Sequence, residues 1–214
     1  MTVQEVITAS RNAYNAIGDS FWSDEEIMGL MDDACLEMAR ESLIIERTYS
    51  TSTVVGTQEY DYPTNTMAIK RVTYDGKKLK PISFREDDAI TGLSQTDTTQ
   101  GTPQYYYQWN ETIGLRPLPS EVKTLKIYSY NEPAAITILS TLEIPSMFHR
   151  GLVHYAVSEM AAKDLNLQHA QYYQQKWMKI LADSRKWAKR RKRTDSPANV
   201  QDEDTMVGTY LGPV

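Results

Sequence analysis

Hydrophobic residues recur every three or four positions in four stretches of the chain, two near each end. This spacing places them on one side of an α-helix. It predicts helices over 2–17, 23–47, 146–166 and 169–193. The second helix has the clearest start, because Ser23 and Glu26 have the spacing of a capping box, flanked by Trp22 and Ile27 as a hydrophobic staple. Ser146 can cap the third helix.

Between Tyr49 and Tyr130 the hydrophobic period changes to two, which is typical of β-strands. Asp75-Gly76 has the composition of a type I′ hairpin turn, with a return strand expected over 77–82. The other strands are predicted over 49–55, 57–63, 67–74, 104–109, 112–116 and 123–130, with a short helix over 84–90. Residues 91–102 are rich in Thr, Ser, Gln, Asp and Gly and predict a mobile surface loop.

Helices that flank a run of strands indicate an α+β protein. We predict a four-helix bundle with an inserted antiparallel β-sheet or sandwich domain. The bundle comprises 1–47 and 146–193, the inserted domain 48–132, and a linker 133–145, and an extended C-terminal tail covers 194–214. The tail has no hydrophobic period, so it is expected to have no core of its own.

Charge is unevenly distributed along the chain. The formal net charge is −5, yet the last predicted helix ends in consecutive cations. The basic residues are Lys186, Lys189, Arg190, Arg191, Lys192 and Arg193. They could line a passage for DNA, dock on an acidic protein partner, or simply form a solvated helix end. Trp177 and Trp187 lie on the apolar stripe of the same helix and are expected to make core or helix–helix contacts and not to stack on bases.

Catalytic and metal-binding patterns are missing from the sequence. His149 and His154 are five residues apart, which does not align two ligands on one helix face, and no cysteine or carboxylate motif joins them or His169. The adjacent carboxylates Asp32-Asp33 and Asp87-Asp88 are explained by solvated helix faces. We therefore expect no enzyme activity, no cofactor and no metal.

The compartment is also constrained by the sequence. Cys35, the single cysteine, falls at helical spacing among apolar residues and is expected to be a buried thiol, so no disulfide framework is possible within the chain. No signal-peptide pattern opens the chain, and no stretch approaches the about 20 apolar residues of a membrane span. The protein is therefore expected to be soluble and cytosolic at synthesis.

Several short stretches together resemble a known family. They are Trp22-Ser23-Asp24-Glu25-Glu26, residues 56–63 (GTQEYDYP), residues 69–76 (IKRVTYDG), residues 101–106 (GTPQYY) and residues 113–119 (IGLRPLP), followed by two closing helices and a tail. In this order the chain resembles the head-to-tail adaptor proteins of tailed bacteriophages, also called connector or head-completion proteins.

The resemblance implies a structural role in the virion, at the interface of head and tail, after synthesis in the host cytoplasm. Copies would form a ring, typically dodecameric, beneath the portal protein, with a tail or nozzle protein below. Double-stranded DNA would pass through the lumen without sequence-specific contacts, and no membrane is involved. The helical part would stack on the portal and the β insertion would face the tail.

Under this resemblance, the basic residues 189–193 and the tail 194–214 form a portal-docking element. Apolar tail residues Met206, Val207, Tyr210 and Leu211 are candidates for that contact. The chain has 14 Tyr and 3 Phe, and tyrosine suits surfaces that are buried only on assembly. Tyr105, Tyr106 and Tyr107 are therefore candidates for exposed subunit contacts, although alternate ones must pack inside the sheet.

Two other functions remain open. A nucleic-acid-binding protein could use the basic C-terminal helix, and neutralising Lys189 to Arg193 would then remove a salt-dependent affinity for DNA. A peptidoglycan hydrolase is a third possibility, because catalytic carboxylate pairs drawn from distant positions leave no spacing to recognise.

Overall fold

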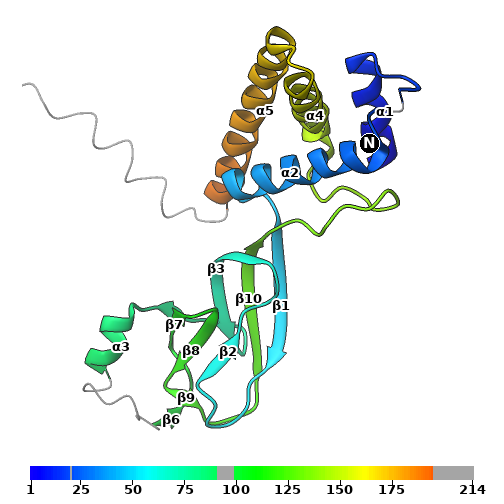
Figure 1. The fold of residues 1–214 in the computed structure, drawn as a ribbon. Coiled ribbons are helices and arrows are strands. Elements are labelled where there is room, and N and C mark those ends of the chain that lie inside the picture. The colour runs from blue at the N-terminus through cyan, green and yellow to red at the C-terminus, as the bar shows by residue number, and fades with distance from the viewer. Residues whose placement is uncertain (20, 91–98, 195–214) are drawn as a thin grey trace, which may run out of the picture. The chain divides into compact units, whose positions relative to one another are not determined.

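The computed structural model describes residues 1–19, 21–90 and 99–194, shown in Figure 1. Contacts divide these residues into two compact units, one of residues Ile45–Glu132 and one of Met1–Ile44 with the described residues from Pro133 onward. We call them the β unit and the helical unit. The chain is therefore α+β, with its main sheets largely antiparallel, as the sequence predicts.

The described residues form five α-helices and ten strands. The helices are α1 (Val3–Tyr14), α2 (Asp24–Ser42), α3 (Phe84–Ile90), α4 (His149–Lys163) and α5 (Leu167–Thr194), with a 3-10 turn, η1 (Ser146–Phe148), before α4. The strands are β1 (Glu46–Ser52), β2 (Glu59–Asp61), β3 (Thr66–Tyr74), β4 (Lys77–Lys78), β5 (Lys80–Pro81), β6 (Gln100–Gly101), β7 (Tyr105–Trp109), β8 (Thr112–Arg116), β9 (Leu118–Pro119) and β10 (Thr124–Asn131). None of these helices carries an apolar stretch long enough to cross a membrane.

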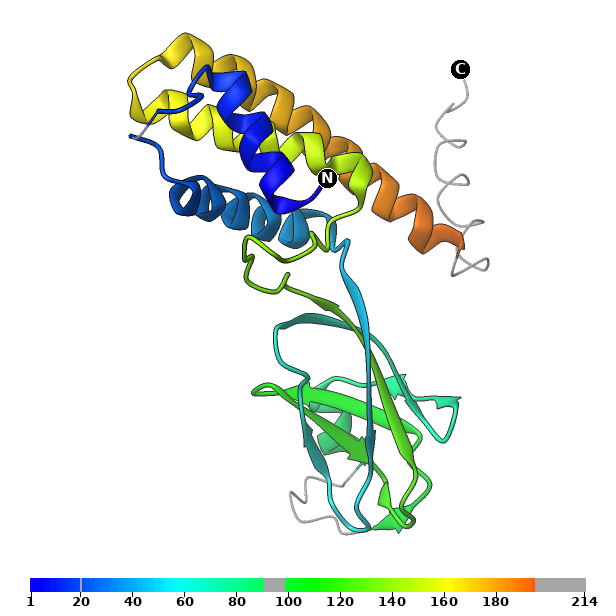
Figure 2. The ribbon, with the colours of Figure 1, turned by 90° about the vertical axis from the view of Figure 1, so that its right-hand side faces the viewer.

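The helical unit is organised around α4, which packs against α5, α1 and α2. Figure 2 shows α4 and α5 side by side in opposite directions, with α1 across them. Ten of the fifteen residues of α4 are buried, so this helix is apolar on most of its surface and lies at the centre of the unit. The helices bury Val6, Ile7, Ile27, Met31, Met38, Leu152, Val157, Met160 and Leu181.

The helix starts follow local hydrogen bonding. Ser23 accepts from the backbone N–H of Glu26 at 3.1 Å, as predicted, but the Glu26 carboxylate pairs with Lys163 of α4 instead of returning to the cap. A complete capping box occurs one helix earlier, between Thr2 and Glu5. The predicted cap at Ser146 is wrong, because η1 starts there after Pro145 and no side chain caps it.

The predicted helix over 23–47 ends at Ser42 and not near Arg47. Leu43 takes the left-handed conformation (φ 50°) and donates its N–H to the Ala39 carbonyl at 2.8 Å, which closes the helix. Glu46 then pairs with Tyr130, and the pairing continues in register to Ser52. Helical spacing persists in the sequence over 43–47, but pairing with β10 determines the structure there.

The β unit contains two four-stranded sheets that share one core. Sheet A has the order β1-β10-β3-β4, and sheet B has the order β2-β8-β7-β5. Both contribute to a single hydrophobic cluster, which contains Val72, Tyr74, Leu79, Tyr106, Ile113, Leu115, Leu125 and Ile127. The predicted alternation is confirmed as far as Ser129, because Leu125, Ile127 and Ser129 are buried while Thr124, Lys126 and Tyr128 are exposed or half-buried. It ends there, since Tyr130 is also buried.

The predicted return strand of the hairpin needs correction. Asp75 and Gly76 both have positive φ, as a type I′ turn requires, but the return strand is split at Leu79. Lys77–Lys78 pairs with β3, whereas Lys80–Pro81 runs parallel to β7 in sheet B. Leu79 is buried between the two, so this side chain in the core marks where the chain passes from one sheet to the other.

The predicted surface loop 91–102 is described only at its end. Gln100–Gly101 forms β6, which pairs in parallel with Leu118–Pro119, so this part is ordered structure and not a loop. Residues 91–98 and the predicted tail beyond Thr194 lie outside the described residues. The short helix predicted over 84–90 is confirmed as α3.

Candidate functional site

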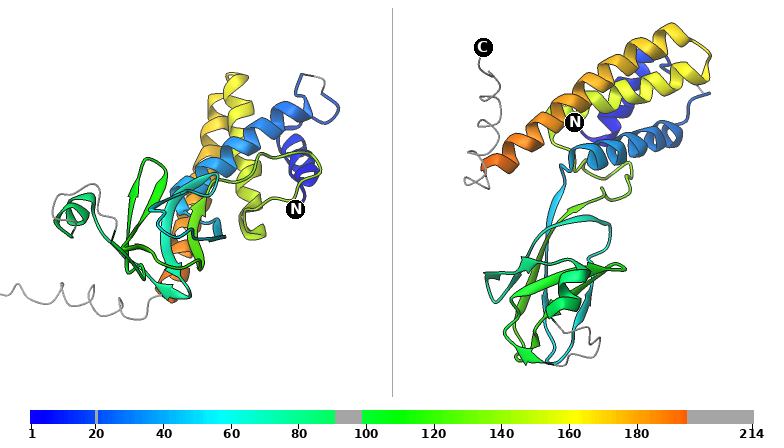
Figure 3. Two further views of the ribbon diagram at one scale, coloured as in Figure 1. Left: turned by 90° about the horizontal axis from the view of Figure 1, so that it is seen from below. Right: turned by 90° about the vertical axis from the view of Figure 1, so that its left-hand side faces the viewer.

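The basic end of α5 is the strongest site predicted from the sequence, and the buried face of the helix determines where its charges point. Trp177, Leu181, Ser184 and Ala188 are buried along one stripe. Trp177 meets Tyr155 of α4 edge to face, with ring centroids 5.3 Å apart. The prediction that this stripe belongs to the core is confirmed. Figure 3 shows α5 continuing past its packed part toward its C-terminal end.

The close approach of α5 to α4 depends on a glycine. A Cβ atom on Gly151 would lie 2.8 Å from Cγ2 of Ile180 and 3.2 Å from Cζ3 of Trp177. Any other residue there would require the side chains of Ile180 and Trp177, or one of the helices, to shift. Further along, Trp187 meets Phe148 edge to face at 5.9 Å, so the second predicted core tryptophan is also a contact between helices.

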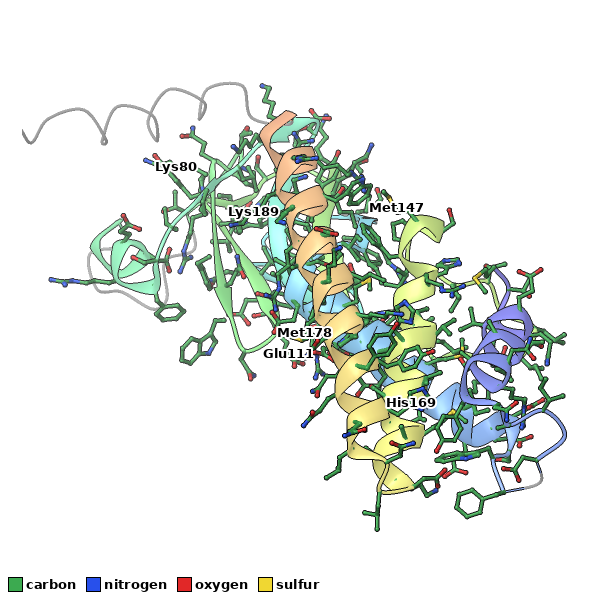
Figure 4. All side chains as sticks on the ribbon, turned by 90° about the horizontal axis from the view of Figure 1, so that it is seen from above. Lys80, Glu111, Met147, His169, Met178 and Lys189 are labelled. Atoms are coloured by element: carbon green, nitrogen blue, oxygen red, sulfur yellow. The ribbon has the colours of Figure 1, made fainter. Side chains whose placement is uncertain are left out.

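Four of the predicted basic residues have described side chains, and all four are exposed: Lys186, Lys189, Arg190 and Arg191. Figure 4 shows Lys189 on α5, nearer the C-terminal end of the helix than Met178 and His169. Lys186 pairs with Asp183 at 3.4 Å, and the guanidinium of Arg191 lies 4.8 Å from the centroid of the Trp187 ring. A cation–π contact of this kind holds Arg191 along the helix with its charge still in solvent.

The rest of that predicted site is not described. The backbone of Lys192 and Arg193 is helical, but their side chains lie outside the described residues. The same holds for the whole of Met206, Val207, Tyr210 and Leu211. The structure thus brings together an exposed cationic surface of Lys186, Lys189, Arg190 and Arg191.

The three consecutive tyrosines of β7 differ in environment. Tyr106 faces the shared core and Tyr107 points to the opposite face of sheet B, yet both are buried, at 4% and 2% exposure. The burial of Tyr106 matches the expectation that alternate tyrosines pack inside the sheet, whereas the expectation of exposure is wrong for Tyr107. Tyr105 is half-buried. Of the three, it is the one with surface available for a neighbouring subunit.

Tyr107 is covered by elements that the hydrophobic pattern did not connect to it. Its ring packs on the register partner Gly114, where an added Cβ would lie 2.0 Å from Cζ. Phe84 of α3 meets the ring edge to face at 5.3 Å, and the Gln58 amide donates to its hydroxyl. Burial raises the pKa of the Tyr107 phenol.

A buried ion pair near this ring was not predicted. Asp87 was expected on a solvated helix face, but it is buried and accepts from Nε of Arg116 at 2.8 Å and from its Nη2 at 3.1 Å. The contact is bidentate, with two N–H groups of the planar guanidinium donating to the two oxygens of the carboxylate. It anchors α3 to β8, a structural role for both charges.

The histidines and the cysteine occupy structural positions. The N-terminal ammonium can only donate and the Ile144 carbonyl can only accept, so His149 is neutral, with Nδ1 3.1 Å from Met1 N and Nε2 2.7 Å from the Ile144 oxygen. Burial, with the positive N-terminus, lowers the pKa of His149. Burial also raises the pKa of the Cys35 thiol to about 12, with smaller contributions from Asp32 and Glu143, so the thiol stays protonated and unreactive at neutral pH.

Within the described residues, no three His, Cys, Asp or Glu side chains converge in a way that could hold a metal ion.

A search of curated proteins finds no match to this chain. A family model described as SU10 adaptor protein matches residues 1–201, which covers both units. The match confirms the resemblance to phage adaptor proteins that the sequence motifs indicate. The chain belongs to the SU10 adaptor protein family.

Proposed function

We propose that the protein is a structural adaptor of a tailed bacteriophage, located in the virion where the head joins the tail. The family match over residues 1–201 is the observation that carries this proposal. In it, copies of the chain form a ring between the portal protein and a tail or nozzle protein, and the genome passes through the lumen.

The two units would have separate tasks in such a ring. The helical unit, as a four-helix bundle of α1, α2, α4 and α5, would stack on the portal, with the exposed charges of α5 as part of the docking surface. The β unit, as a sandwich of sheets A and B, would contact the tail or nozzle protein. Tyr105 would contribute to contacts between subunits. We propose no catalytic step, since docking and assembly require only binding.

Light scattering after size-exclusion chromatography tests this proposal. The mass of the full-length protein is measured alone and after mixing with purified portal rings of the same phage. We expect the mixture to gain a mass that corresponds to one ring of adaptor per portal ring. A protein that leaves the portal mass unchanged at micromolar concentration would refute the adaptor function.

A nucleic-acid-binding protein that acts alone is the second candidate, favoured by the exposed cations Lys189, Arg190 and Arg191. The same experiment separates the two. A monomer or dimer that ignores the portal but binds duplex DNA in a salt-dependent manner would support the second candidate. A zymogram with bacterial cell walls as substrate tests the remaining alternative, a peptidoglycan hydrolase.

A further inference from the structure

Strand pairing in sheet A gathers cations that are distant in the sequence. Lys126 of β10 pairs with Thr73 of β3, and Thr73 pairs with Lys78 of β4. Two residues further along β10, Tyr128 pairs with Arg71 of β3. Residues directly opposite each other share a face of the sheet, so Arg71, Lys78 and Lys126 lie together on one side. It is the outer side, because Leu125 and Ile127 of β10 point into the core.

This outer face is compact. Neighbouring strands lie about 4.8 Å apart and alternate residues about 6.8 Å apart, so the Cα atoms of the three cations form a triangle with sides of about 8 to 10 Å. All three side chains are exposed. The Arg71 guanidinium lies 4.4 Å from the centroid of the Tyr128 ring, which orients it along the sheet surface.

Among the described residues, no carboxylate neutralises the three charges. In the part of the chain that the structure describes, none of the three takes part in an ion pair, whereas Lys70 on the same sheet pairs with Glu46 at 3.3 Å. Like charges on neighbouring strands repel, and this weakens the sheet. An external anion would remove that repulsion.

The remaining residues of the face indicate which anion. β1 contributes Thr48, Ser50 and Ser52 to it, and Ser50 lies directly opposite Lys126. Hydroxyl groups beside Lys and Arg are the usual partners of phosphate oxygens in DNA complexes. No aliphatic side chain stands among these hydroxyls and cations, whereas protein interfaces bury an apolar core. The chemistry therefore fits a phosphate backbone better than an acidic protein.

We propose that the outer face of sheet A, formed by Arg71, Lys78 and Lys126 with the hydroxyls of β1, binds the phosphate backbone of double-stranded DNA without reading its sequence. Duplex DNA carries one negative charge per about 1.7 Å of its axis, so a face about 10 Å wide meets several phosphates. The inference rests on the proposed function and deepens it, since it names the surface of the subunit that meets the genome.

Fluorescence anisotropy with a labelled duplex of random sequence tests the inference. The full-length wild type is compared with the triple variant Arg71→Gln, Lys78→Gln, Lys126→Gln between 50 and 300 mM salt. Each lost phosphate contact makes the plot of log affinity against log salt less steep by about 0.9. We expect the triple variant to lose about 2 to 3 from that slope, and at least about tenfold in affinity at 100 mM salt.

Two further proteins make the result specific. The double variant Lys78→Gln, Lys126→Gln keeps the contact between Arg71 and Tyr128 and should lose about 2 from the slope, which guards against misfolding of the triple variant. The control Lys77→Gln, Lys80→Gln, Lys179→Gln removes the same charge from other exposed positions and should stay close to wild type. Equal losses in the control and the triple variant would overturn the inference.

Two other outcomes would also overturn it. One is a loss of DNA affinity in Lys189→Gln, Arg190→Gln, Arg191→Gln with none in the sheet variant, which would place DNA on α5. In the other, the wild type binds poly-L-glutamate more tightly than the duplex, and the same three sheet substitutions weaken that binding. This result would indicate an acidic protein partner. Portal joining is measured on the same proteins. If wild type joins the portal but the sheet variant binds DNA normally, this inference fails while the adaptor function stands.

Discussion

Arg116 of β8 binds Asp87 of α3 through two hydrogen bonds, Nε to Oδ1 at 2.8 Å and Nη2 to Oδ2 at 3.1 Å, with both residues 4% exposed. The guanidinium also lies 5.9 Å from the centroid of the Tyr107 ring. A buried pair of this kind adds little net stability compared with apolar residues, but removing one of its charges is strongly destabilising. It determines where α3 sits on sheet B.

Replacing Asp87 by Ala is expected to destabilise the β unit by about 3 to 5 kcal/mol, because the buried Arg116 guanidinium loses both of its hydrogen bonds to that carboxylate. Urea unfolding, monitored by hydrogen exchange of the backbone amides of β7 and β8, measures this loss of stability within the β unit. Asp61→Ala, at an exposed position of β2, is the control and should change stability by less than about 0.5 kcal/mol. The paired change Asp87→Leu with Arg116→Met should recover most of the loss. Equal stability of Asp87→Ala and Asp61→Ala would contradict a buried ion pair between Asp87 and Arg116.

Gly114 of β8 is expected to reject any side chain. A Cβ there would lie 2.0 Å from Cζ of Tyr107, so Gly114→Ala must displace the ring from its contact with Phe84. Overpacking of a core typically costs about 1 to 3 kcal/mol. Thermal unfolding of the β unit measures the loss, and the double variant Gly114→Ala with Tyr107→Ala, which removes the clash, should show less than the sum of the two single losses. Additive losses would show that the ring and the glycine are not coupled.

Gly151 and Gly29 offer a matched pair of helical glycines. At Gly151 an added Cβ would lie 2.8 Å from Cγ2 of Ile180, whereas at the exposed Gly29 of α2 nothing lies within 4 Å. Alanine is the better helix former by about 0.5 to 1 kcal/mol, so Gly29→Ala should stabilise the helical unit by about that amount. Gly151→Ala should destabilise it by about 1 to 3 kcal/mol. Differential scanning calorimetry of both variants checks the opposite signs, and a gain in both would refute tight packing of α4 on α5.

The helices and most strands could be predicted from the sequence because apolar spacing reports directly which side of an element is buried. The α5 stripe through Trp177 and Leu181 is an example. The same rule fails at Tyr106 and Tyr107, which are adjacent and both buried, since sheet B is covered on both faces. Nothing local in the sequence shows that Phe84 will cover one of them.

Only some of the charged features could be predicted from the sequence, for a related reason. The basic run of α5 is contiguous and therefore visible, whereas Arg71, Lys78 and Lys126 meet only through strand register. Register depends on long-range pairing, which no periodic pattern encodes. The sequence similarly predicts a solvated carboxylate at Asp87, because its partner Arg116 is distant in the chain.

Acid is expected to destabilise the helical unit through its buried histidines. Burial, aided by Lys176 and Arg150, lowers the pKa of His154 to about 4, so the folded state favours the neutral ring. The unfolded ring has a pKa of about 6.5. The stabilisation is complete above pH 6.5 and falls as the pH drops from 6.5 toward 4. Melting temperatures measured from pH 7.5 to 5 should decline, and His154→Phe should flatten the decline. An unchanged slope in that variant would contradict the role of His154.

The basic end of α5 is expected to act in docking and not in folding. Lys189, Arg190 and Arg191 are exposed, so the variant Lys189→Gln, Arg190→Gln, Arg191→Gln should keep its melting temperature to within a few degrees. The small change expected is loss of the Arg191 contact with Trp187, about 0.5 to 1 kcal/mol. Portal joining measured by light scattering should weaken by at least about tenfold at 100 mM salt, because three cations leave the docking surface together. Lys179→Gln, on the same helix but outside that end, is the control. If the triple variant joins the portal as wild type does, then the charged helix end is simply solvated, and docking must use another surface of the helical unit.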